Sequence, residues 1–331
     1  MSTIYLNQHG TEVTKDGGKL KIKTRDGKVQ QIPSSYAECF VVMASVQITH
    51  AVIMEVLDRG GSIVYLAKDG SIAGELGSKL GRPRNLVRQL ACYMDPVKRQ
   101  HMASIFIKKK LQAERNFLST KYKSIKSGAL KAAISKISGL IKIAEPKRTV
   151  ETLMGIEGIG AKTYFDAFSL LLAGSGFEWS GRKRRPATDP VNAMLNLGYA
   201  LLEKDVRRVI SASGLSLSIG YLHELEYRKD SLVYDVMEIF RTKVVDRFVF
   251  RSIGLGVIRP EDFLIDGDKC IFREALKKKF IAAYEDYVEA KEEETDISLI
   301  RQIELEVSYI TKELRELTVD KEDCTGDKDV A

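Results

Sequence analysis

The chain has 331 residues, enough for two domains; 44% of them are hydrophobic and only 7 are proline. This composition excludes an intrinsically disordered chain and indicates a folded, helix-rich protein. The formal net charge of +7 suits a polyanionic partner, but the distribution of the basic residues is more informative than their sum.

The cysteines and the apolar segments indicate the compartment. Cys39, Cys92, Cys270 and Cys324 form no CxxC pair, which argues against a zinc ribbon or a redox motif. Scattered thiols fit a reducing environment. The N-terminus has no apolar signal core, and no apolar run approaches the ~20 residues that a membrane span needs. The sequence therefore predicts a soluble, cytoplasmic protein with no membrane partner.

Residues 1–80 have the pattern of a compact β-rich domain. Gly17-Gly18 and Asp26-Gly27 are turn signals, and the latter is a good hairpin signal. Thr49–Asp58 has apolar residues at helical spacing and ends at a glycine pair that can cap a helix. The expected strands are Thr3–Asn7, Lys19–Thr24, Gln30–Pro33, Cys39–Val42, Ser62–Ala67 and Ser71–Leu76.

Beyond a polar stretch that contains Pro83, the apolar residues recur with a period of about 3.6. We assign residues 81–95 to a linker, 96–320 to an all-α domain without strands, and 321–331 to a disordered acidic tail. The expected helices are Pro96–Thr120, Thr149–Leu172, Val191–Ser211, Leu232–Phe250, Ile271–Glu293 and Ile297–Leu317. The predicted fold class is α+β, with a small N-terminal β-rich domain followed by a larger all-α domain.

The segment Gly220–Arg241 combines a histidine with two carboxylates. Asp235 and Glu238 share one face if the segment is helical, and His223 precedes them by twelve positions or more. Carboxylate oxygens with an imidazole nitrogen suit a hard divalent cation. Their neighbours are mostly apolar, and buried carboxylates need a cation or an arginine. Arg241 is therefore an alternative partner for Glu238, and a lone histidine is more often a capping or packing residue.

Glu157 lies in the glycine-rich segment Leu153–Phe165, which resembles a turn ahead of a helix. The segment nearly matches a phosphate-binding loop, but Ala161 stands where that motif needs glycine, and no nucleotide-binding strand precedes it. The glycines also fit the hairpin of a helix-hairpin-helix module, whose backbone amides approach a phosphate. In that alternative the protein is a catalytically silent DNA-binding scaffold built around Gly155–Lys162.

A run of four basic residues, Arg182, Lys183, Arg184 and Arg185, falls in an expected loop between helices. Such a run raises the local positive charge and predicts salt-sensitive, non-specific contacts with the DNA backbone. Further lysines cluster at residues 108–110, 121–126 and 277–279. Lysine runs on helices are usually solvated faces, so the loop cluster is the stronger candidate.

Four motifs together resemble a known family. They are Gly155-Ile156-Glu157-Gly158 with Tyr164-Phe165; Asp189 to Leu202; Gly220-Tyr221-Leu222-His223; and Ser231-Leu232 with Asp235, Glu238 and Arg241. Each motif is weak by itself, but their order and spacing resemble the CRISPR-associated endonuclease/integrase family over nearly the whole chain. This family supplies the larger, catalytic subunit of the spacer-acquisition complex.

The resemblance implies a catalytic site in the helical domain. Its metal ligands would be Glu157, His223 and Asp235, while Glu238 would be catalytic as a further ligand or in support of one. This set of side chains suits Mg²⁺ or Mn²⁺ better than zinc, because no cysteine or second histidine accompanies it. Tyr164 would lie beside the site, where a DNA contact and helical core packing are equal explanations.

The resemblance also implies the reaction and the partners. Attack of water on a phosphodiester would cut a DNA strand, whereas attack of a 3′-hydroxyl would insert a short fragment, the spacer, into a repeat array. The β-rich domain would form a homodimer, and a small CRISPR-associated adaptation subunit would bridge two dimers. An integrase relative that serves a mobile element would have the same site, so only genomic neighbours would separate the two.

Overall fold

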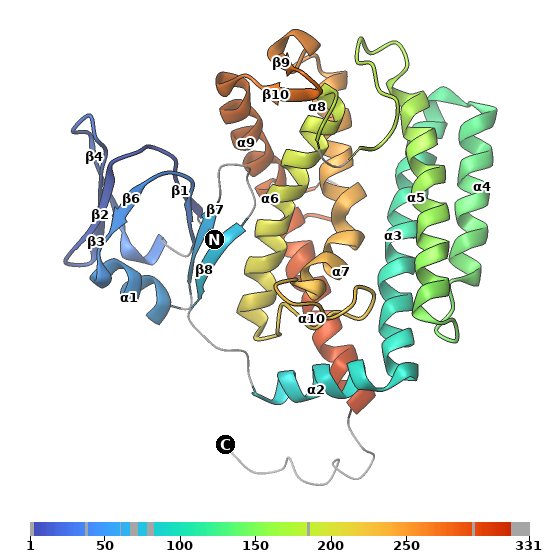
Figure 1. Ribbon diagram of the computed structural model, residues 1–331, viewed down its shortest axis with the longest axis horizontal. Helices are drawn as coiled ribbons and strands as arrows, with labels where there is room; N and C mark the ends of the chain where they lie inside the picture. Colours follow the sequence, from blue (N-terminus) through green and yellow to red (C-terminus); the bar gives the residue numbers. More distant parts are fainter. Residues whose placement is uncertain are drawn as a thin grey trace. The chain divides into compact units, whose positions relative to one another are not determined.

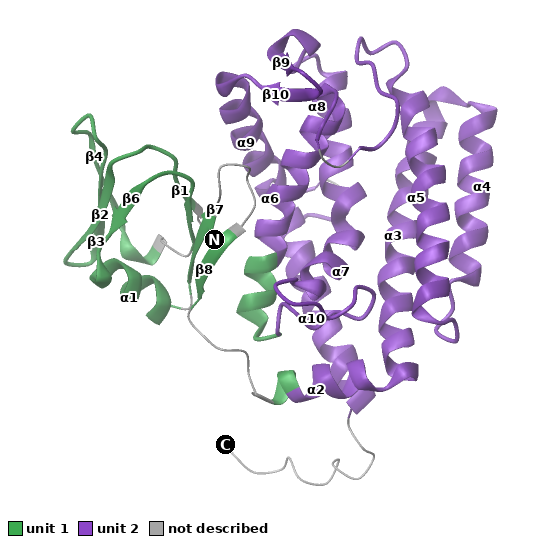
Figure 2. Ribbon diagram, in the orientation of Figure 1, with its two compact units in different colours: residues 1–86, 207–215 green, residues 87–206, 216–331 purple. Residues whose placement is uncertain are grey.

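A computed structural model of the chain describes residues 3–36, 39–59, 61–66, 72–77, 83–183, 186–292 and 295–318. They fall into two compact units, residues 1–86 with 207–215 and residues 87–206 with 216–331 (Figure 2). Strands predominate at the N-terminus and helices predominate afterwards. The predicted α+β class, with a small β-rich region before a larger helical one, is confirmed.

The N-terminal region contains two four-stranded sheets, with strand orders β1-β5-β7-β8 and β4-β3-β2-β6 (Figure 1). In the first sheet β5 pairs in parallel with both neighbours, and all four of its residues are buried, as is typical of a central parallel strand. The elements are β1 (Thr3–Leu6), β2 (Thr11–Asp16), β3 (Lys19–Lys23), β4 (Val29–Pro33), β5 (Cys39–Val42), β6 (Val46–Ile48), α1 (His50–Asp58), β7 (Ser62–Leu66) and β8 (Ile72–Gly77).

Every expected strand of this region is present, and two further strands lack a clear sequence signal. The turns at Gly17 and Gly27 have φ values of 58° and 84°, the left-handed backbone that their hairpins require. The unexpected strands are β2, in which only Thr11 and Val13 are buried, and the three-residue β6. With one buried apolar residue in β2, Val13, and only three residues in β6, the apolar alternation is too short to predict a strand.

The remainder of the chain is mostly helical. Its long central helix α3 packs against α4, α5 and α7 (Figure 1). Asp95 begins α3 by accepting hydrogen bonds from two backbone amides of its first turn. The helices are α2 (Pro83–Met94), α3 (Pro96–Ile125), α4 (Gly128–Ile143), α5 (Val150–Leu172), α6 (Pro190–Ser213), α7 (Ser231–Phe240), α8 (Arg247–Gly254), α9 (Glu274–Glu289) and α10 (Leu299–Thr318).

Two assignments in this region are wrong. Most of the expected linker, residues 81–95, is helix α2, which begins at Pro83. Proline is tolerated in the first turn of a helix, so it marked a helix start and not a break. A hairpin of β9 (Phe263–Asp266) and β10 (Lys269–Phe272) lies where no strand was expected, and its turn contains Gly267 at a φ of 60°.

The glycine-rich segment around Glu157 lies inside the continuous helix α5. The expected turn is therefore wrong, and so is the hairpin on which the scaffold alternative depends. Gly160 has a packing role, because a Cβ added there would overlap the Leu111 side chain of α3. Added Cβ atoms at Gly155 and Gly158 would meet no atom of the described residues within 4 Å.

A π-helical segment, Arg241–Asp246, joins α7 to α8, so the chain is continuously helical from the start of α7 to the end of α8. Such segments are frequent at functional sites, because the wider turn changes which side chains face inward. Here Asp246 and Thr242 of this segment are buried.

Some sequence features have no counterpart in the described structure. The expected acidic tail, residues 321–331, and its Cys324 lie outside the described residues, whereas Cys39, Cys92 and Cys270 are buried. None of the helices in the described part of the chain is both long and apolar enough to cross a lipid bilayer.

Two glycine substitutions test whether the glycine-rich segment around Glu157 is part of helix α5. Gly158→Ala should raise the free energy of unfolding by about 0.5–1 kcal/mol, because alanine favours a helix interior and the site is open. Gly160→Ala should instead lower it, because the new methyl group would overlap Leu111. Urea unfolding of the two variants measures both effects, and a destabilised Gly158→Ala would contradict a continuous helix.

Candidate metal centre

His223 and Asp235 form a closely hydrogen-bonded pair at the start of α7. Asp235 is fully buried, and its Oδ1 lies 2.7 Å from Nδ1 of His223 and accepts the His223 backbone amide at 3.0 Å. Its Oδ2 accepts the backbone amides of Tyr221 at 2.5 Å and Leu222 at 3.0 Å. Four donors thus occupy the acceptor positions of one carboxylate. This leaves Asp235 poorly placed as a metal ligand and makes it the group that orients His223.

The loop before α7 can supply these amides only because residue 220 is glycine. A Cβ at Gly220 would lie 2.7 Å from the backbone carbonyl carbon of Ser231 and 2.9 Å from Oδ2 of Asp235. Ser231 holds the other end of the loop, since its hydroxyl donates to the carbonyl oxygen of Glu224 at 2.5 Å. The Gly-Tyr-Leu-His motif is therefore a cradle for a buried carboxylate.

The Nδ1 contact decides which nitrogen of His223 is available. Because Nδ1 is held by Asp235, Nε2 is the nitrogen that can bind a metal ion or accept a proton. The His223 side chain is 26% exposed, so part of the ring is accessible to solvent.

Two carboxylates from different helices converge on one ammonium group. Nζ of Lys110, on α3, donates to Oε2 of Glu238 on α7 at 2.6 Å and to Oε1 of Glu157 on α5. The other oxygen of Glu238 accepts from Nε of Arg241 at 2.9 Å. Glu157 is 26% exposed, whereas the side chains of Lys110 and Glu238 are each only 8% exposed. Three helices therefore meet at a cluster of opposite charges.

These neighbours keep Glu238 ionised although it is buried. Burial acts to raise its pKa, but Arg241 and Lys110 outweigh this effect and hold the pKa at about 2. For Lys110, burial acts to lower the pKa, and Glu238, Glu114 and Glu157 together raise it above its ordinary value. Both partners are charged at neutral pH.

A second, more deeply buried polar group lies behind this cluster. Glu114 of α3 is 1% exposed, and its Oε2 has no hydrogen-bond partner among the residues that the structure describes. Burial raises its pKa to about 8, so this carboxyl is neutral at pH 7. Asp246 is also buried, which raises its pKa, and accepts the Tyr199 hydroxyl at 2.5 Å.

Tyr164 is fully buried in an aromatic core. Its ring packs against Phe117, Phe165 and Phe168, with centroids 5.2 to 6.1 Å away. This placement favours the packing explanation, because a DNA contact would require the side chain to leave the core.

The predicted basic loop is anchored to the start of α6. Arg182 donates to the side-chain oxygens of Asn192 at 3.0 Å and Asn196 at 2.8 Å, so its guanidinium stabilises the loop. Lys183 is exposed, and its backbone amide donates to Asn192 at 2.9 Å. Arg184 and Arg185 lie outside the described residues.

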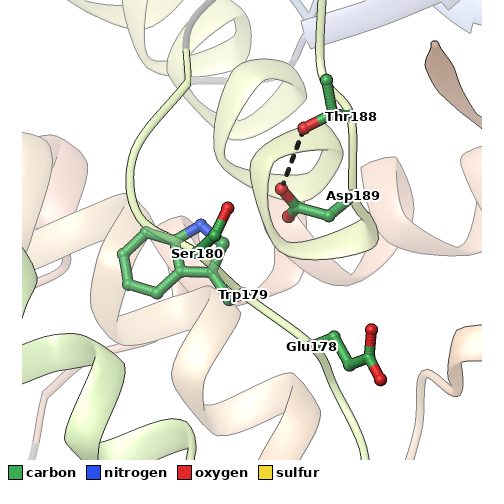
Figure 3. A pocket seen from close by; sticks show the side chains of 5 residues that line it. All are labelled: Glu178, Trp179, Ser180, Thr188 and Asp189. Atoms are coloured by element: carbon green, nitrogen blue, oxygen red, sulfur yellow. Dashed lines mark hydrogen bonds between the residues drawn. The ribbon is translucent and has the colours of Figure 1, made fainter.

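The same loop borders an open pocket (Figure 3), and no residue of the charged cluster is among the residues that line it. Within it the hydroxyl of Thr188 donates to Asp189, which also accepts the Asn192 amide at 2.8 Å at the start of α6. The pocket is lined by Glu178, Trp179, Ser180, Thr188 and Asp189. It contains none of the site residues predicted from the sequence.

In the described residues, no three His, Cys, Asp or Glu side chains form a ready-made ligand cluster. Two carboxylates nevertheless already surround a cation, and His223 is close enough to lower the pKa of Glu238. Hard divalent cations prefer such oxygen and imidazole donors. Glu157, His223 and Glu238 therefore fit a divalent cation on the condition that Lys110 gives up its position.

Comparison with known proteins identifies the family. A family model described as "CRISPR associated protein Cas1" matches residues 4–286. The chain belongs to this family. The family predicted from the motifs is thus confirmed.

Curated Cas1 relatives support this assignment. The chain is 30% identical to "CRISPR-associated endonuclease Cas1 3" of Thermus thermophilus, over 86% of this chain and 84% of that protein. It is 29% identical to "CRISPR-associated endonuclease Cas1 1" of Thermodesulfovibrio yellowstonii, over 87% of this chain and 92% of that protein. The expected class, a CRISPR-associated nuclease, is therefore confirmed at the level of the family.

Solved structures share the Cas1 fold. A Cas1 protein from Thermotoga maritima has a TM-score of 0.81 at 23% identity, and the match covers 95% of this chain and 97% of that one. A casposase bound to integration product has a TM-score of 0.78 at 23% identity, with 97% and 92% covered. At these identities the likeness concerns the fold alone.

The sequence prediction missed two ionisable residues of this candidate site, Lys110 and Glu114. Lys110 stood in a run of lysines that resembled a solvated helix face. The signal was available, because buried apolar residues recur along α3 at helical spacing and both residues fall on that stripe. The buried residues of α3 are Met102, Ala103, Ser104, Phe106, Ile107, Lys110, Leu111, Ala113, Glu114, Phe117 and Leu118.

The raised pKa of Glu114 predicts a pH-dependent stability. Between about pH 5 and pH 8 the folded protein holds a proton that the unfolded chain has released. The free energy of unfolding should therefore fall as pH rises across this window, by up to about 1.4 kcal/mol per pH unit from this group. Glu114→Gln has nothing to titrate and should flatten the slope in urea unfolding. Identical slopes for both proteins would contradict a neutral Glu114.

Proposed function

We propose that this Cas1 family member is a metal-dependent DNA endonuclease and integrase of CRISPR adaptation, which inserts short DNA fragments into a repeat array. Family membership supports the nuclease and integrase class. The observation that carries the proposal is that Glu157 and Glu238 converge on one positive group, the ammonium of Lys110, with His223 nearby.

The proposed ligands of Mg²⁺ or Mn²⁺ are Glu157, His223 through Nε2, and Glu238. Glu238 replaces Asp235 in the set expected from the sequence, because the four hydrogen-bond donors around Asp235 leave it no free acceptor position. A bound divalent ion supplies Lewis-acid polarisation of a phosphate oxygen and favours ionisation of an attacking hydroxyl.

The residues of the chain prepare this site. Asp235 holds Nδ1 of the His223 ring and leaves Nε2 as the nitrogen for the metal ion, and Arg241 keeps Glu238 ionised by pairing with one of its oxygens. Water bound at this site would hydrolyse a phosphodiester, whereas a DNA 3′-hydroxyl would join a fragment to the repeat. The nucleophile therefore decides whether the outcome is cutting or insertion.

Double-stranded DNA is the proposed substrate. Among the residues of the predicted basic loop, Lys183 is exposed and available to phosphates, whereas Arg182 is held by the asparagines of α6. Arg184 and Arg185 remain proposed DNA-binding residues. Tyr164 would support the site only indirectly, through its packing in the core. A solved structure of similar fold is described as a TtCas1–DNA complex, with a TM-score of 0.60.

The proposed assembly is a homodimer formed through the β-rich region, with two dimers bridged by a small adaptation subunit. A solved structure of similar fold is described as a Cas6-RT-Cas1–Cas2 complex, with a TM-score of 0.79. We extend this type of assembly to the present chain as part of the proposal, in a cytoplasmic setting.

An integrase that serves a mobile element is the alternative role, and the chain shares its fold with a casposase bound to integration product. The fold does not distinguish this role from CRISPR adaptation, because both kinds of protein share it. Genomic neighbours distinguish them: a repeat array and a small partner gene accompany an adaptation integrase, whereas terminal repeats flank a mobile element.

Strand transfer and metal binding test the proposed ligands. Purified protein would be mixed with a short duplex bearing free 3′-hydroxyls and a repeat-containing plasmid, in Mg²⁺, Mn²⁺ or EDTA. Joining should require the metal ion and be lost in Glu238→Gln and His223→Ala. Asp235→Asn should lower Mn²⁺ affinity or activity by only about 10–100-fold, as expected for a residue that orients a ligand.

Glu306→Gln is the matched control for these variants, because Glu306 pairs with Lys109 at 2.5 Å in a separate carboxylate–lysine contact. It should retain wild-type joining and Mn²⁺ affinity. If Asp235→Asn lost Mn²⁺ binding completely while Glu238→Gln retained it, the ligand set expected from the sequence would be right. Binding of DNA with neither cutting nor joining, and with no effect of EDTA, would refute the catalytic function.

The exposed lysine of the basic loop gives a separate prediction. Lys183→Glu should weaken DNA binding to a similar extent for all sequences, because phosphate contacts carry no sequence information. The slope of log affinity against log salt concentration should become shallower by about 1 for each phosphate that the variant no longer neutralises. Fluorescence anisotropy at several salt concentrations measures this slope, and an unchanged slope would remove Lys183 from the DNA interface.

A further inference from the structure

Lys110 takes the place between the two carboxylates that a metal ion would need. Its side chain is only 8% exposed, and its ammonium contacts one oxygen of Glu157 and one of Glu238. These glutamates belong to different helices, α5 and α7, so the ammonium links three helices through charge. Two of the three N–H donors of this buried ammonium therefore have carboxylate partners.

The charges of the four side chains in direct contact balance one another before any metal ion binds. Glu157 and Glu238 carry two negative charges, and Lys110 and Arg241 carry two positive charges. Glu114 adds no charge at pH 7, because burial keeps its carboxyl protonated. A divalent ion that joined these four side chains without displacing one would add two positive charges to a largely buried site that already holds Lys110 and Arg241, which is unfavourable. The ion and the ammonium must therefore oppose each other's binding.

We propose that Lys110 is a built-in counter-cation, which holds Glu157 and Glu238 together in the metal-free protein and leaves them when a divalent ion binds. The inference rests on the proposed function, because it takes these carboxylates as metal ligands. Lys110 spares the two glutamates from mutual repulsion and keeps them in place. In return, it lowers the affinity for the metal ion.

A purely structural ion pair predicts the opposite effect on metal binding. If Lys110 only supported the fold, its removal would let the carboxylates move apart, and Mn²⁺ affinity would fall. If Lys110 competes with the ion, its removal frees both carboxylates, and Mn²⁺ affinity rises. The sign of the change therefore separates the two roles.

The test is Mn²⁺ binding to the full-length protein by calorimetry. Lys110→Met removes the charge and keeps the length, and Lys110→Gln keeps a hydrogen-bond donor in case the methionine variant does not fold. Both should bind Mn²⁺ more tightly by roughly tenfold, within the 5–150-fold range typical of coupled binding. The matched control is Lys109→Met, because the adjacent Lys109 pairs with Glu306 and lies over the Tyr309 ring. Its Mn²⁺ affinity should not change.

Circular dichroism and thermal melting accompany the titrations. Without metal, the Lys110 variants should melt at a lower temperature than the wild type, and Mn²⁺ should raise their melting temperature by more than it raises that of the wild type. Folded Lys110 variants with unchanged or weaker Mn²⁺ affinity would overturn the proposal.

Glu238→Gln separates this proposal from the proposed function. If the wild type binds Mn²⁺ and Glu238→Gln does not, the metal site stands, whatever the Lys110 variants show. If none of the proteins binds Mn²⁺, both the metal site and the role of Lys110 are overturned.

Discussion

The need to satisfy a buried carboxylate organises one half of the candidate site. Asp235 has no exposed surface, and an unpaired charge at such a position would be strongly destabilising. The loop before α7 satisfies it with three backbone amides and the imidazole of His223. Gly220 lets that loop pass close enough to do so. The position and tautomer of His223 are thus consequences of how one carboxylate is accommodated.

The other half of the site depends on charge balance between helices. Glu157 and Glu238 would repel each other across the gap between α5 and α7, and Lys110 of α3 offsets this repulsion. Arg241 adds a second positive charge where the regular helix α7 passes into the π-helical segment. The fold therefore brings two carboxylates together before any metal ion is present, as a preorganised site requires. The Lys110 ammonium that makes this possible also lies between the two carboxylates.

The aromatic and polar packing behind the site holds α3 and α5 at a fixed separation. Gly160 allows the two helices to approach at Leu111, and Tyr164 lies in an aromatic core that includes Phe117 of α3. Because Glu157 lies one turn before Gly160 on α5, this close packing also places the carboxylate opposite Lys110. The glycines that resembled a turn in the sequence serve a contact between helices.

The sequence by itself determined the fold class, most of the strands and helices, the family and the residue types of the site. These follow from local patterns: apolar periodicity, turn glycines and short motifs around His223 and Glu157. Only the tertiary structure distinguished the surroundings of Asp235 from those of Glu238. Both lie on one face of α7, so sequence spacing cannot rank them, and what separates them is contact with a loop in one case and with α3 in the other. Lys110 became part of the site for the same reason, because the partners of a charged side chain depend on segments far away in the sequence.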